Sequence, residues 1–130
     1  MSEHAKSNAA NWAESIADMM ARLKAAQEAD DSEAWGAVLT EIDGSPLDIR
    51  VRDGWRGPHD DDKGEPEEYF ILLSTGGPAL RIYGALCWHE PEDAVLQWQD
   101  WGTPWTDFLE LTEEQADAIL AYARQFGIGG

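Results

Sequence analysis

The fold of this chain is decided by one stretch, Tyr69-Phe70-Ile71-Leu72-Leu73-Ser74-Thr75-Gly76-Gly77-Pro78-Ala79-Leu80-Arg81-Ile82. Tyr69 to Leu73 is an unbroken apolar run with aromatic and branched side chains, which predicts a buried strand. From Ala79 to Trp88, large apolar residues alternate with other residues, which predicts a strand with one buried face. Because Thr75 to Pro78 has the composition of a tight turn, the stretch predicts a β-hairpin.

Two further strands flank this hairpin. Leu47 to Val51 alternates apolar with charged residues and is predicted to be half-buried. Ala94 to Trp101 alternates as well, with Leu96 and Trp98 on the same face. Since the turns are short, we expect an antiparallel meander of about four strands.

Helices are predicted before the sheet. Apolar residues recur at helical spacing from Ala9 to Gln27, whereas Met1 to Asn8 is polar and is predicted to be flexible. Ser32 is predicted to cap a second helix, in which Trp35 begins an apolar stripe that ends before Gly44. The short acidic turn between these segments predicts two antiparallel helices.

One more helix is predicted after the sheet. Thr112 to Gln115 has the pattern of a capping box, and apolar residues at helical spacing follow it as far as Phe126, before Gly127. Residues 1–130 are therefore expected to form a single α+β domain, an about four-stranded, mostly antiparallel sheet with the N-terminal helices and a C-terminal helix packed on it.

The charge balance indicates the class of partner. The chain has 26 Asp and Glu against 9 Lys and Arg, a formal net charge of −17 over 130 residues. Such a field repels nucleic acids and anionic membranes and attracts basic surfaces. Because 43% of the residues are hydrophobic and seven are Trp, the chain is expected to fold rather than to remain a disordered acidic tail.

The single cysteine and the lack of a membrane segment indicate the compartment. Cys87 has no partner for an internal disulfide, and its apolar neighbours predict a small buried hydrophobe. No apolar leader and no membrane-spanning stretch is recognised in the sequence. We therefore expect a cytoplasmic protein that is neither exported nor inserted.

The acidic residues cluster in segments that are predicted to be turns or helix starts. A surface of this kind can imitate the phosphates of a nucleic acid and occupy a groove that binds one. The alternative is that the charge serves only solubility or adaptation to salt. The predicted partner-binding residues are Asp30, Asp31, Glu33, Asp60, Asp61, Asp62, Glu65, Glu67 and Glu68.

No catalytic, cofactor-binding or metal-binding residue is predicted. The segment from His59 to Glu68 matches only a fragment of a calcium loop, so we expect it to be a mobile, solvated loop that binds no metal tightly. Gly76 to Pro78 does not fit a phosphate-binding loop, because Pro78 lacks the backbone donor that such a loop needs. The chain is therefore not expected to be an enzyme.

Three tryptophans, Trp98, Trp101 and Trp105, lie close together near the end of the predicted sheet. Core and sheet-edge packing is one interpretation, and a hot spot for protein binding is the other. A base-stacking platform is not expected, because such platforms accompany a basic groove and this region of the sequence is acidic.

Two segments, Tyr69 to Ile82 and Leu96 to Thr106, resemble a family of small acidic proteins encoded by phages and plasmids. The resemblance extends over about Leu47 to Phe126, and the family has no assigned enzymatic activity. What the resemblance implies is a mobile genetic element, whose small acidic proteins include inhibitors of host defence such as anti-CRISPR and antirestriction proteins. Family likeness alone does not determine function.

The expected function is stoichiometric inhibition of a host defence system. The chain would bind a basic nucleic-acid-binding protein or complex, such as a CRISPR effector, by DNA or RNA mimicry and without binding nucleic acid or membrane itself. The alternative is a binding module that uses a Trp-rich surface without mimicry. A monomer and a homodimer both remain open, since an edge strand can pair with a copy of itself.

Overall fold

The computed structural model of this chain describes residues 2–53, 66–75, 78–87, 90–100 and 103–128. Its elements are α1 (Ser2–Glu28), α2 (Ser32–Gly44), β1 (Asp48–Asp53), β2 (Pro66–Ser74), β3 (Ala79–Cys87), β4 (Glu90–Pro91), β5 (Val95–Gln99), β6 (Thr106–Asp107), α3 (Glu113–Ala123) and the 3-10 turn η1 (Arg124–Phe126). The predicted α+β class is confirmed. Of the segment from His59 to Glu68 that was predicted to be a mobile loop, residues 59–65 lie outside the described residues. The loop prediction is wrong for Pro66 to Glu68, which belong to β2.

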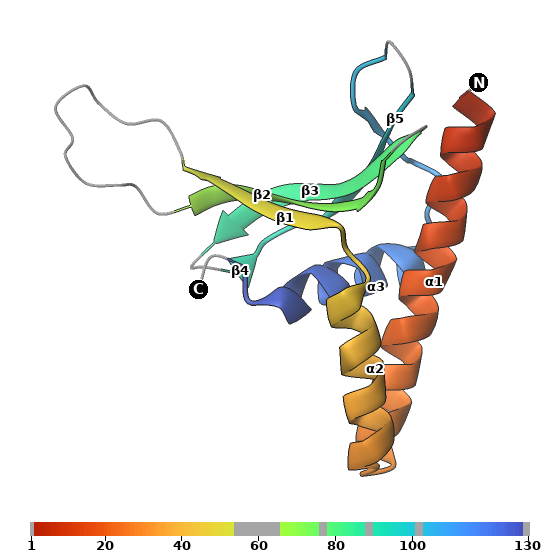
Figure 1. Cartoon of the computed structure of the whole chain (residues 1–130), viewed down its shortest axis with the longest axis vertical. Coiled ribbons are helices and arrows are strands. Elements are labelled where there is room, and N and C mark those ends of the chain that lie inside the picture. The colour runs from red at the N-terminus through yellow and green to blue at the C-terminus, as the bar shows by residue number, and fades with distance from the viewer. Residues whose placement is uncertain (1, 54–65, 76–77, 88–89, 101–102, 129–130) are drawn as a thin grey trace, which may run out of the picture.

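The described strands form one antiparallel sheet in the order β1-β2-β3-β5-β6, with β4 paired to the end of β3. The helices lie on one side of this sheet, and the turn between α1 and α2 lies far from it (Figure 1). None of the described helices has the length and apolar character needed to cross a membrane. The sheet therefore has a covered face and an open face.

The covered face contains the core. Ile49, Ile71, Ile82 and Leu96 occupy matching positions on four adjacent strands, and the last three are fully buried. Alternation along each strand directs these side chains toward the helices. The predicted hairpin of Tyr69 to Ile82 is thus the centre of the sheet, as β2 and β3.

The first helix begins at Ser2 rather than at Ala9, so the prediction that Met1 to Asn8 is flexible is wrong for the described residues of that segment. Ala5, Ala9 and Ala13 are buried. Their spacing of four residues extends the apolar face of the helix toward its N-terminus. The Asn8 Nδ2 atom donates to the Ser74 Oγ atom of β2 at 2.9 Å. Small side chains at these positions let α1 approach its neighbours closely, which a search for large apolar residues overlooks.

The second helix is capped by Asp31, not by Ser32 as predicted. The Asp31 Oδ1 atom accepts a hydrogen bond from the Ala34 backbone N at 3.1 Å. At the other end, the Ser45 hydroxyl lies 2.5 Å from the Tyr122 hydroxyl of α3. These contacts define where the helix begins and tie its end to the rest of the fold.

Two side chains are more exposed than predicted. Cys87 is exposed, because β3 buries Leu86 and the next residue points the other way. Trp35 is 42% exposed, whereas Val38 and Ile42 of the same predicted stripe are buried. The stripe of α2 therefore packs only in its later turns.

The last helix confirms its predicted start. Thr112 and Gln115 form a capping box, in which the Gln115 backbone N donates to Thr112 Oγ1 at 3.1 Å and the Thr112 backbone N donates to Gln115 Oε1 at 3.0 Å. Gly127 follows η1 with a φ of 62°, a left-handed conformation that glycine adopts without strain.

Gly84 provides a test of the packing between β3 and the segment before β5. A Cβ atom at this position would collide with the backbone carbonyl of Asp93, whose oxygen also accepts the Tyr69 hydroxyl at 2.6 Å. We expect Gly84→Ala to lower the free energy of unfolding by about 2 kcal/mol or more, measured by urea denaturation.

Gly36→Ala is the matched control, since Gly36 lies in α2 and a Cβ there meets no atom within 4 Å. It should leave stability unchanged or raise it by up to about 1 kcal/mol, because alanine is the better helix former. Equal effects of the two substitutions would contradict the proposed close approach.

A second test concerns the cap of α2. Asp31→Ala should cost about 1 kcal/mol of stability, because the Ala34 N–H loses its acceptor. Asp31→Asn removes the same charge but keeps a capping oxygen, so it should retain most of the stability. Thermal melts of both variants and of Ser32→Ala decide which residue caps α2. A larger loss of stability in Ser32→Ala than in Asp31→Ala would show that Ser32 is the cap.

Candidate binding surfaces

Four carboxylates gather at the turn between α1 and α2. They are Glu28, Asp30, Asp31 and Glu33, here called the acidic hairpin end, and all four are exposed. None of them forms an ion pair with any other residue that the structure describes. Asp30 has a φ of 53°, a left-handed conformation that Asp tolerates better than most residues. The chain reversal therefore concentrates negative charge at one end of the molecule.

Trp35 lies beside the acidic hairpin end. Together with Ala26, Gln27, Asp30, Asp31 and Ser32 it lines an open hollow of about 320 Å³. An exposed indole next to unpaired carboxylates combines an apolar contact with long-range attraction for cations. This combination suits a basic protein surface.

The other predicted binding residues are not gathered there. Asp60, Asp61, Asp62 and Glu65 lie outside the described residues. Glu67 and Glu68 belong to β2, which lies far from the acidic hairpin end (Figure 1). Of the predicted set, the structure brings together Asp30, Asp31 and Glu33.

Glu68 differs from the solvated carboxylate that was predicted. It is half-buried, and the Arg52 Nη2 atom donates to its Oε2 atom. The same Nη2 atom lies 3.5 Å from the Tyr83 hydroxyl. The Arg52 guanidinium holds the pKa of Glu68 below its usual range, and burial together with Glu68 raises the pKa of Tyr83. Its charge is thus already compensated within the chain.

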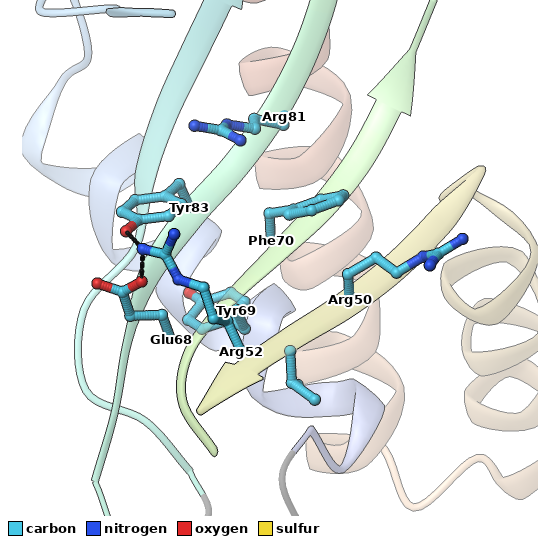
Figure 2. A pocket seen from close by; sticks show the side chains of 8 residues that line it. Arg50, Arg52, Glu68, Tyr69, Phe70, Arg81 and Tyr83 are labelled. Carbon is cyan, nitrogen blue, oxygen red and sulfur yellow. Dashed lines mark hydrogen bonds and ion pairs between the residues drawn. The ribbon is translucent and has the colours of Figure 1, made fainter. Parts of the chain in front are cut away.

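The open sheet face is a second candidate surface. We use this name for Arg50, Arg52, Glu68, Phe70, Arg81 and Tyr83, which come from three adjacent strands and lie around one hollow of about 250 Å³ (Figure 2). The pairing register places Arg50, Phe70 and Tyr83 side by side. Three of the nine basic residues of the chain line this hollow, and among the residues that the structure describes Glu68 is its one acidic lining residue.

Arg81 is the most constrained of these arginines. Its Nε atom donates to Gln97 Oε1 at 2.9 Å, and Gln97 Nε2 donates in turn to Asp107 Oδ1 at 2.8 Å. Its guanidinium carbon lies 4.2 Å from the ring centroid of Trp105, 4.9 Å from that of Tyr83 and 5.6 Å from that of Phe70. These distances are typical of cation–π contacts.

The sequence did not indicate this cluster, because its arginines are separated by up to thirty-one positions and become neighbours only through strand pairing. The alternation in β1 and β3 was a partial signal, since it directs Arg50, Arg52 and Arg81 to one face. The acidity around Trp105 in the sequence was misleading, because in the fold the Arg81 guanidinium carbon lies 4.2 Å from the centroid of its ring.

Other chemistry is not evident in the described part of the chain. There, no group of three or more His, Cys, Asp or Glu side chains is arranged to hold a metal ion. The same residues include no buried side-chain nitrogen or oxygen without a hydrogen-bond partner. The sites that can be described are therefore exposed surfaces.

Comparison with known proteins yields no relative. No family model matches this chain, and neither a curated protein nor a solved structure matches it. The resemblance to small acidic phage and plasmid proteins stays a prediction.

The Arg52–Glu68 pair makes a pH-dependent prediction. Since the Glu68 pKa is lowered by Arg52, the stabilisation is present above the pKa of an unfolded glutamate and is lost as the pH falls through the Glu68 pKa. Carboxyl-carbon NMR should show Glu68 titrating at a lower pH in the native chain than in Arg52→Gln. Identical midpoints in the two proteins would show that Arg52 is not the cause.

Proposed function

We propose that this protein acts without catalysis, by binding a basic nucleic-acid-binding surface of a partner through the acidic hairpin end. The observation that supports this most directly is the grouping of Glu28, Asp30, Asp31 and Glu33 on one exposed turn, with no cation paired to them among the described residues. Unpaired surface carboxylates attract the Lys and Arg side chains that normally hold phosphates.

The hairpin is suited to present these charges rigidly. Arg22 of α1 bonds Glu41 of α2 through both terminal nitrogens, at 2.8 and 2.9 Å, and its Nε atom bonds Asp18 at 2.8 Å. Leu23 and Val38 are buried in the same region. A binding surface that is ordered beforehand loses less conformational entropy when it binds.

Inhibition of a host defence system is the biological role that we propose for this binding. It rests on the resemblance of Tyr69 to Ile82 and Leu96 to Thr106 to mobile-element proteins, together with the net charge of −17. A protein that occupies the nucleic-acid groove of an effector complex would block it stoichiometrically, without a cofactor. CRISPR effectors and restriction enzymes both contain such grooves.

The alternative is binding through tryptophan without mimicry. Trp98 is only 8% exposed, so it offers little surface to a partner. Trp105 is half-buried under Arg81, and Trp101 lies outside the described residues. Trp35 is therefore the tryptophan that best fits this alternative, because it is 42% exposed at the acidic hairpin end.

The test compares two sets of isosteric substitutions. The first is Glu28→Gln, Asp30→Asn, Asp31→Asn and Glu33→Gln, which removes four charges and keeps the cap of α2. The second is Glu110→Gln, Glu113→Gln, Glu114→Gln and Asp117→Asn, which removes four exposed charges around the start of α3. Both proteins have the same net charge.

Partners are first captured from a bacterial extract with the native chain, and their association is then measured at low and high salt. The first set should slow association by about tenfold or more and reduce its salt dependence, whereas the second should change it little. DNA or RNA bound by the partner should compete with the native chain. If both sets act equally, the charge is nonspecific and the proposal fails.

Trp35→Ala separates the alternative from mimicry. An aromatic hot spot would be favoured by three results together. Trp35→Ala weakens binding, the first set of substitutions has no effect, and the partner binds DNA and the native chain at the same time.

A further inference from the structure

The open sheet face has the opposite charge to the rest of the molecule. Its hollow is lined by three arginines and one glutamate, whereas the whole chain has a net charge of −17. No described helix covers this face, because all of them lie on the other side of the sheet (Figure 1). Charges more than about 8 Å away are largely screened at physiological ionic strength, so the field at this site depends mainly on the residues around the hollow, where three arginines outnumber one glutamate.

Arg81 has donors to offer to a ligand. Among the described residues its Nε atom is bonded to Gln97, and neither terminal nitrogen has a hydrogen-bond partner or a carboxylate. By contrast, Arg50 is paired with Asp48 and Arg52 with Glu68. The chain has almost three carboxylates for each basic residue. An arginine that has no carboxylate partner among the described residues is therefore unusual, and its terminal nitrogens can bind an anionic ligand.

The orientation of Arg81 is established before any ligand arrives. The bonds from Arg81 to Gln97 and from Gln97 to Asp107 hold one edge of the guanidinium, and its carbon lies 4.2 to 5.6 Å from the ring centroids of Trp105, Tyr83 and Phe70. Partial burial lowers the Arg81 pKa, although arginine remains charged. A fixed guanidinium fork binds the paired oxygens of a phosphate or a carboxylate.

We propose that the open sheet face binds a single nucleotide, with its phosphate on the terminal nitrogens of Arg81 and its base against the ring of Phe70. Phe70 and Arg81 line the same hollow, and Figure 2 shows the Phe70 ring between the side chains of Arg81 and Arg50. Stacking of bases on aromatic rings is favourable for every base. Arg50 and Arg52 line the same hollow, but each is paired with a carboxylate, so Arg81 provides the main attraction for the phosphate.

The size of the site and the overall charge favour one nucleotide over a long strand. The hollow of about 250 Å³ lies just below the roughly 300–1,000 Å³ of sites that enclose drug-sized ligands. A long polyanion would also extend into the field of the remaining carboxylates, which repels it. The nucleotide is either free or the phosphorylated end of a short single strand. Both ligands present one phosphate and one base to the site.

The test is titration of the native chain, followed by calorimetry and by backbone and side-chain NMR. The probes are AMP, adenosine, ribose 5-phosphate, a short 5′-phosphorylated oligothymidylate and an oligoglutamate peptide. AMP should bind, and adenosine and ribose 5-phosphate should each bind more weakly, because each lacks one of the two recognised groups. Shifts should concentrate on Phe70, Arg81, Tyr83 and the indole N–H of Trp105.

Three variants assign the contacts. Arg81→Gln should weaken AMP binding by about tenfold or more, since a charge-assisted pair is lost. Phe70→Leu should weaken AMP more than ribose 5-phosphate. Arg124→Gln is the matched control, because Arg124 bonds the Pro91 carbonyl near η1 and does not line the hollow. It should bind AMP as the native chain does.

The outcomes separate cleanly. Tighter binding of the oligothymidylate than of AMP identifies the end of a strand as the source, and equal or weaker binding identifies a free nucleotide; both support the site. The proposal is overturned if AMP and the oligothymidylate fail to bind at up to about 10 mM, if oligoglutamate binds instead, or if Arg81→Gln and Arg124→Gln behave alike. Should Arg81→Gln not fold, the shifts in the native chain decide, and shifts outside the open sheet face overturn the proposal. The open sheet face and the acidic hairpin end share no residue, so the outcome of this test does not depend on the proposed function.

Discussion

Burial of the inner face of the β2–β3 hairpin beneath α1 and α3 is the interaction on which the rest of the structure depends. Tyr69, Ile71 and Ile82 are nearly inaccessible to solvent, and each is a strand residue that faces the helices. Apolar burial of this kind has to offset the mutual repulsion of an excess of carboxylates. The acidic residues are accordingly at the periphery, since no buried polar or charged residue occurs among the described residues.

The same arrangement leaves the outer face of the sheet without a covering layer. Phe70 and Tyr83 are half-buried there by neighbouring side chains, with Arg81 contributing its flat guanidinium to their cover. Arginine suits this position, because it can lie on aromatic rings and still reach water with its charged end. Three of the nine basic residues, Arg50, Arg52 and Arg81, thus gather on the open sheet face, and four exposed carboxylates gather at the acidic hairpin end.

Sequence patterns were sufficient to predict the longer elements, whereas the two-residue strands β4 and β6 were not predicted. An unbroken apolar run indicated β2, alternation indicated β3 and β5, and helical spacing indicated α3. The start of α1 was missed because its buried positions are alanines, and the burial of Cys87 was predicted wrongly because neighbouring residue types were weighed above the alternation of β3. Sequence patterns report spacing along one segment, and they are least informative at its ends.

The candidate surfaces were predictable to different degrees. Asp30, Asp31 and Glu33 are close in the chain, so a single turn brings them together and local sequence reveals them. Arg50, Phe70 and Arg81 become neighbours through the register of β1, β2 and β3. Register depends on the whole sheet, and it cannot be read from any one strand.

The length of α1 has a consequence for the dynamics of the molecule. Ala5 and Ala9 in its first half are buried with the sheet and α3, while its second half pairs with α2, which packs mainly on α1. Opening of α2 exposes Val38, Ile42 and the side of α1 that they cover, whereas detachment of α1 uncovers the whole core. Amide hydrogens of α2 should then exchange through local openings, and those in the first half of α1 only through global unfolding. One continuous helix thus joins two cooperative units of unequal stability.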